Sequence, residues 1–100
     1  MTSQGIEAFL SYLRETEQRY HMSEVNEQEA NNETQDILHS LELQDHDYHD
    51  FARLSKELRG VRQKRRAAKD TMSETAPVLD WIDQNRPTIK SLERLLGDVR

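Results

Sequence analysis

The feature that most restricts the fold of this chain is the absence of proline and glycine between Gly5 and Gly60. These two residue types most often end helices and form tight turns, so a long stretch without them favours long helices. A sheet of several strands needs turn residues at short intervals, and the 100-residue chain has three Gly and two Pro. We therefore predict an all-α protein that forms a single domain over residues 1–100.

The N-terminal segment has the periodicity of an amphipathic helix. Four apolar residues lie at offsets of zero, three, four and seven: Ile6, Phe9, Leu10 and Leu13. This spacing places them on one helix face, and Ser3 has a side chain suited to an N-cap. We predict a first helix over about residues 4–44.

The aspartate-rich stretch around residue 47 is the best place for the chain to turn. Asp47 is a good N-cap, and Asp50 then occupies the third helical position, where a carboxylate is favourable. We predict a second helix over about 48–72 that returns antiparallel to the first.

The second helix carries an apolar seam with alternating steps of three and four: Phe51, Leu54, Leu58, Val61, Arg65, Ala68 and Met72. This is the pattern of a coiled coil. With the turn near residue 46, facing positions should add up to about 92, which pairs Leu38 with Leu54, Asn31 with Val61 and Glu27 with Arg65. We therefore predict a structural ion pair between Glu27 and Arg65.

Two prolines divide the C-terminal part. Pro77 predicts a break or kink near 73–77, followed by a short helix over about 77–84, because proline removes a backbone donor and clashes with the preceding turn. Pro87 marks a second boundary, before a helix over about 88–99. We expect one or two short helices here, packed on the N-terminal end of the first helix.

The two arms of this predicted hairpin have opposite charge. Residues 15–50 contain eleven Asp or Glu and one Arg, whereas residues 53–69 contain eight Lys or Arg and one Glu. In an antiparallel hairpin the arms lie side by side, so we expect the basic run mainly to match its acidic neighbour.

Two functional alternatives rest on the same charges. Arg59, Arg62, Arg66 and Lys69 share one helix face and are candidate contacts for nucleic acid or an acidic partner. The net charge of −5 and the lack of aromatic residues beside this face weigh against nucleic acid. Alternatively, the acidic arm imitates a phosphate backbone and acts as a decoy inhibitor of a nucleic-acid-binding or defence protein of the host.

The sequence shows no recognisable catalytic machinery. It contains no Cys, and it has neither a glycine-rich phosphate loop nor a nucleophile elbow. His46 and His49 lie among carboxylates, but their spacing matches no established metal motif, and polar turn residues explain them better. We predict no enzyme activity, cofactor or metal.

Three segments resemble a known group of proteins: TQDILHSLEL (34–43), LSKELRGVRQKRRAAKD (54–70) and LERLLGDVR (92–100). Together they resemble small helical proteins encoded by phages and prophages of Gram-positive bacteria. The resemblance implies no catalytic residues, but it does imply a phage protein acting in the cytoplasm of a bacterial host. Relatives in the group continue past the last segment, so we expect the natural product to extend beyond Arg100.

The leading functional prediction is a non-enzymatic protein that binds another protein of the host or the phage through a helix face. Self-association is a further expectation, because the predicted seam contains the polar residues Asn31, Glu27 and Glu24. No apolar run approaches the length of a membrane span, and the N-terminus lacks the features of a signal peptide, so we expect no membrane contact.

Overall fold

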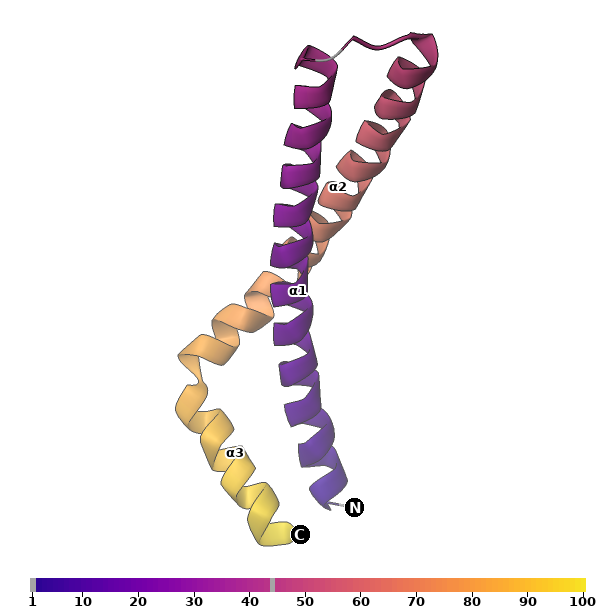
Figure 1. Ribbon diagram of the computed structural model, residues 1–100. Coiled ribbons are helices and arrows are strands. Elements are labelled where there is room, and N and C mark those ends of the chain that lie inside the picture. Colours follow the sequence, from indigo (N-terminus) through magenta and orange to yellow (C-terminus); the bar gives the residue numbers. More distant parts are fainter. Residues whose placement is uncertain (1, 44) are drawn as a thin grey trace.

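The computed structural model describes residues 2–43 and 45–100, and within them it contains three helices. These are α1 (Thr2–Leu43), α2 (Tyr48–Gln84) and α3 (Arg86–Val99). As Figure 1 shows, α1 and α2 form a long antiparallel hairpin, and α3 runs back toward the N-terminal end of α1. The molecule measures 67 × 25 × 17 Å. The predicted fold class is confirmed.

The first helix begins earlier than predicted. It includes Thr2, so Ser3 lies in the first turn rather than at the N-cap. The predicted end at Gln44 lies outside the described residues.

The corner between α1 and α2 is held by local contacts. Asp47 is the N-cap of α2 as predicted, and its Oδ1 accepts a hydrogen bond of 2.9 Å from the amide of Asp50. His46 packs its ring edge against Phe51, with the ring centroids 5.6 Å apart. The Nε2 atom of His46 lies 2.6 Å from the carbonyl oxygen of Ser40, and its side chain is 6% exposed. This histidine therefore joins the last turns of α1 to the start of α2.

The seam between α1 and α2 has a seven-residue repeat on both helices. Between residues 16 and 75 the buried positions are Thr16, Ser23, Ala30 and Ile37 on α1, and Leu54, Val61, Ala68 and Thr75 on α2. When they are paired in antiparallel order, the two residue numbers of each pair, such as Ile37 and Leu54, add up to 91. This sum is one less than predicted. Leu38, Asn31 and Glu24 are therefore not the residues that α1 buries, and Leu38 is 37% exposed.

Hydroxyl groups explain why this polar seam is buried. Thr16 Oγ1 donates to the carbonyl oxygen of Tyr12 at 2.7 Å, and Thr75 Oγ1 donates to that of Thr71 at 2.8 Å. A hydroxyl satisfied within its own helix is buried at little cost, and a small side chain lets the helix axes approach closely. The prediction from apolar periodicity had no means of recognising these positions as core.

The sequence predicts a break or kink near Pro77, and the structure shows no break, because α2 continues through this residue to Gln84 and includes the segment expected as a separate helix. A proline within a helix costs about 3 kcal/mol. Pro77 is exposed, and so is Ser73, whose carbonyl group loses its helical partner. Water can satisfy that carbonyl, while Thr75 and Ile82 are buried on either side of the proline. Tertiary packing thus outweighs the local preference.

A single residue, Asn85, separates α2 from α3. Its amide donates to the carbonyl oxygen of Ile82 at 3.1 Å, and its own carbonyl accepts from the amide of Ile89 at 3.0 Å. Arg86 was predicted to precede the last helix, but it is the first residue of α3, with Pro87 in the first turn, where proline is tolerated.

Ion pairs connect both ends of α3 to α1. Arg86 Nη2 lies 3.3 Å from Glu17 Oε2, and Arg100 pairs with Glu7. Between these two arginines in the sequence lies Leu96, which is buried. This residue contributes to the packing of α3 on the N-terminal part of α1.

Candidate nucleic-acid interface

The basic run of α2 is largely unpaired. Of the six Arg and Lys side chains in residues 59–69, all of them described, only Lys64 forms an ion pair with α1. Its Nζ lies 3.7 Å from Glu33 and 3.9 Å from Glu29. The other five are exposed and form no ion pair with a described residue: Arg59, Arg62, Arg65, Arg66 and Lys69. We call these five residues the basic strip.

This finding corrects the expectation that the basic run is matched by the acidic arm. The two arms do lie side by side, but five of the six cations form no ion pair with a described residue of α1. On a helix wheel Arg59, Arg62 and Arg66 lie about 100° to 160° round from Val61, which faces the seam. Side chains at that angle reach solvent before they reach the carboxylates of the neighbouring helix.

The predicted ion pair between Glu27 and Arg65 is absent from the ion pairs of the described residues. Glu27 is half-buried and Arg65 is exposed. In the observed register the facing residue numbers add up to 91, so Arg65 is no longer the residue opposite Glu27. The ion pairs between this part of α2 and α1 are instead those of Lys64 with Glu29 and Glu33 among the described residues.

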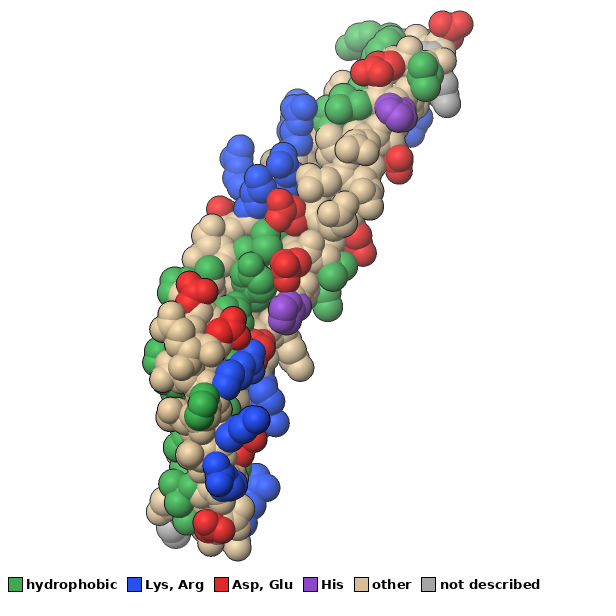
Figure 2. Space-filling view, turned by 90° about the vertical axis from the view of Figure 1, so that its left-hand side faces the viewer, with side chains coloured by type: hydrophobic (Ala, Val, Ile, Leu, Met, Phe, Trp, Pro, Cys, Tyr) green, Lys and Arg blue, Asp and Glu red, His purple; other side chains and the backbone are tan. Residues whose placement is uncertain are grey.

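The basic strip borders two adjoining hollows in the surface. One, of about 500 Å³, is lined by Ser55, Leu58, Arg59, Arg62, Gln63 and Arg66. The other, of about 340 Å³, is lined by Arg62, Arg65, Arg66, Lys69 and Asp70. Arg62 and Arg66 belong to both, so the hollows form one continuous basic surface. Figure 2 shows Lys and Arg side chains in two groups, one on the upper half of the molecule and one on the lower half.

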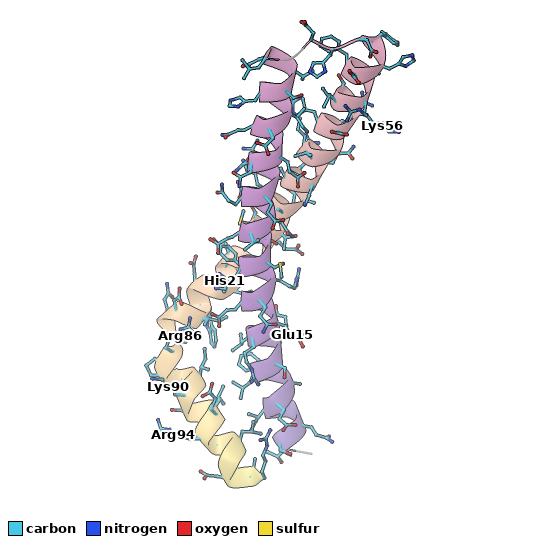
Figure 3. All side chains as sticks on the ribbon, viewed as in Figure 1. Glu15, His21, Lys56, Arg86, Lys90 and Arg94 are labelled. Atoms are coloured by element: carbon cyan, nitrogen blue, oxygen red, sulfur yellow. The ribbon has the colours of Figure 1, made fainter. Side chains whose placement is uncertain are left out.

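A second basic row lies on α3 and was not recognised from the sequence. Arg86, Lys90 and Arg94 follow one another along α3 at intervals of four residues (Figure 3), and Arg86 is paired with Glu17 of α1. Hydrogen bonds to Asp83 and Glu17 raise the pKa of Arg86. Lys90 and Arg94 are exposed and make no ion pair with a described residue, so the row has two unpaired cations against five in the basic strip. The interval of four would have revealed this row.

An apolar hollow lies between α1 and α2 near their other end. It measures about 310 Å³ and is lined by Phe9, Tyr12, Leu13, Pro77, Val78 and Trp81. The rings of Phe9 and Trp81 meet edge to face, with centroids 6.0 Å apart. Trp81 is 39% exposed and Tyr12 is 52% exposed, so these aromatic residues are not fully enclosed.

The histidines at the corner do not gather as metal ligands. His46 is turned toward Ser40 and Asp50, whereas His49 is exposed beside Tyr48. Within residues 2–43 and 45–100, no three His, Cys, Asp or Glu side chains are grouped so that they could share a metal ion. None of the helices in that part of the chain has the length and apolar character needed to cross a membrane.

Comparison of the chain with protein-family models, curated proteins and solved structures finds no match. The phage context and the bacterial cytoplasm therefore remain predictions from the three sequence segments. The functional argument rests on the surfaces described above.

Proposed function

We propose that this protein is a nucleic-acid-associated binding protein that contacts phosphates through the basic strip of α2. The observation that supports the proposal is that five exposed cations on one helix face have no ion-pair partner among the described residues. Arginine and lysine left unpaired on one surface are typical of phosphate-binding faces. Four of the five are arginines, whose guanidinium groups suit two-pronged contacts with phosphate oxygens.

The surroundings of the strip favour a polyanion over a membrane surface. Helices that lie on membranes carry exposed apolar residues beside their basic ones. The two hollows contain one apolar lining residue, the half-buried Leu58, and otherwise polar or charged side chains. A face of this kind has nothing to insert among lipid chains.

The net charge of −5 does not prevent local binding. Charges farther than a Debye length of about 8 Å are largely screened at physiological salt. A phosphate seated among Arg62, Arg65 and Arg66 would therefore respond mainly to these three neighbours. The acidic arm lowers the overall affinity and makes binding more sensitive to salt.

The test is titration of the purified protein into a fluorescently labelled DNA duplex of about 20 base pairs at about 50 mM salt. We expect the double variant Arg62→Glu/Arg66→Glu to lose about tenfold or more in affinity, because it removes two phosphate contacts and adds two repulsive charges. The emission of Trp81 should stay unchanged on binding, since this residue is twelve positions beyond Lys69, or about 18 Å along the helix.

The matched control is Lys90→Glu/Arg94→Glu on α3. It changes the net charge by the same amount and also affects exposed cations that form no ion pair with a described residue. This variant should bind within about threefold of the unmodified protein, because the α3 row is not part of the strip. Equal losses in the two variants would mean that net charge alone governs binding, and no binding by the unmodified protein would reject the proposal.

Protein–protein interaction, the leading prediction from the sequence, is the second candidate function. The observation that favours it is the apolar hollow, because partly exposed Trp and Tyr side chains are enriched in the energetic centres of protein interfaces. Trp81 is the only tryptophan of the chain, so its emission reports on this hollow. A protein partner that shifts this emission would support the second candidate, and one that leaves it unchanged would count against this site.

A further inference from the structure

The geometry of the basic strip also indicates which form of nucleic acid it binds, an inference that rests on the proposed function. Arg59 and Lys69 mark its two ends, which lie about 15 Å apart at 1.5 Å per residue of helix. All five cations belong to one uninterrupted helix, so their order and spacing are fixed by its backbone. The strip is therefore a short, straight row of charge.

No aromatic residue lines either hollow of the strip. Proteins that bind single strands without sequence preference combine cations with aromatic side chains on which the bases stack, worth about 1–3 kcal/mol per base. Without such stacking, a flexible single strand has to be ordered by phosphate contacts alone. The lining residues thus disfavour single strands.

A duplex presents a higher density of phosphate charge to the strip than a single strand does. Its two strands together carry about one phosphate per 1.7 Å of axis, and each neutralised phosphate releases more counterion than in a single strand. A duplex is also already ordered before it binds. Both effects favour the duplex on a straight row of five cations.

The width of the hairpin limits contact with the bases. The two shorter dimensions of the molecule are 25 and 17 Å, because α1 accompanies α2 beside the strip. The major groove of B-form DNA is about 12 Å wide and admits a single helix. The paired helices are too broad to enter it together, which favours contact of the strip with the phosphates over contact with the bases.

We infer that the basic strip binds double-stranded nucleic acid through its phosphate backbone, without reading the base sequence. Backbone contacts position a protein on a duplex but carry no sequence information. The five cations correspond to a slope of about −4.5 in a plot of log affinity against log salt, at about 0.9 per phosphate neutralised. Raising the salt from about 50 to about 200 mM should then weaken binding by a factor of a few hundred.

The experiment compares labelled probes at several salt concentrations: two duplexes of unrelated sequence, one of the corresponding single strands, and oligothymidine. We expect the two duplexes to bind with affinities within about twofold of each other and the single strands to bind about tenfold more weakly. Arg66→Ala should reduce the slope of the salt dependence by about 0.9 if Arg66 contacts one phosphate.

Each outcome bears separately on the two proposals. Single strands that bind as tightly as duplexes would overturn the inference while leaving nucleic-acid binding in place. A preference of about tenfold for one duplex sequence would also overturn it, because it requires contacts with base edges. An unchanged slope in Arg66→Ala would remove this residue from the phosphate contacts, and failure to bind any probe would reject both proposals.

Discussion

At the scale of single residues, short-range hydrogen bonds decide where the helices begin and which polar groups are buried. Asp47 accepts from the amide of Asp50 and thereby starts α2. The hydroxyl groups of Thr16 and Thr75 donate hydrogen bonds to backbone carbonyl groups of their own helices. These contacts remove the penalty of burying polar atoms, so an apolar side chain is not required at every position of the seam.

The cap at Asp47 can be tested by Asp47→Ala. We expect the free energy of unfolding to fall by about 1 kcal/mol, the usual effect of losing an aspartate N-cap. Urea unfolding followed by circular dichroism measures this change. Asp45→Ala is the matched control, because Asp45 is exposed and has no hydrogen bond or ion pair with a described residue, and its effect should stay within about 0.5 kcal/mol. Equal effects of the two substitutions would show that the cap does not stabilise the corner.

At the scale of helices, one position of register separates the observed hairpin from the predicted one. Ala30, Ile37, Leu54 and Val61 form its buried cluster, with Leu41 and Leu58 packed against them. The predicted register placed Leu38 opposite Leu54 instead. Because consecutive residues of a helix differ by about 100° in direction, a shift of one position changes which residues face the partner and which face solvent.

Alanine substitutions at two neighbouring positions distinguish the registers. Ile37→Ala should lower the free energy of unfolding by about 2–4 kcal/mol, because it leaves a cavity in the buried cluster. Leu38→Ala should cost about 1 kcal/mol, since much of that side chain is already in water. Thermal or urea unfolding of the two variants provides the comparison. A larger loss for Leu38→Ala would support the register predicted from the sequence and reject the structural one.

At the scale of the whole molecule, the chain is an elongated rod. Its radius of gyration is 21.0 Å, whereas a compact domain of 100 residues has about 13 Å. A rod exposes more surface per residue than a sphere, so its stability depends on one narrow seam and its charged faces remain accessible along their length. This shape is what leaves the basic strip open to a ligand as long as a duplex.

Small-angle X-ray scattering of the purified protein tests the shape. We expect a radius of gyration close to the 21.0 Å of the structure, independent of protein concentration, with a mass that corresponds to one chain of 11.8 kDa. A value near that of a compact domain would contradict the extended hairpin. A doubled mass would show that the self-association expected from the polar seam occurs.

Much of the candidate site could be located in the sequence, but its accessibility could not. Arg59, Arg62, Arg66 and Lys69 were identified from their common helix face, and they all belong to the basic strip. Arg65 was assigned instead to an ion pair with Glu27, because the sequence pattern was one position out of register. The row on α3 could have been found from its interval of four, whereas the apolar hollow depends on contacts between α1 and α2, which periodicity within one helix does not report.

The sequence alone determined the helical character of the chain, the corner at Asp47 and the opposite charges of the two arms, because these depend on neighbouring residues. Only the tertiary structure decided the register of the hairpin, the continuity of α2 through Pro77 and the exposure of the basic strip. Each of these depends on the balance between local preference and contacts across the seam. In this protein small buried residues and satisfied hydroxyl groups determine that balance, and hydrophobic periodicity does not detect them.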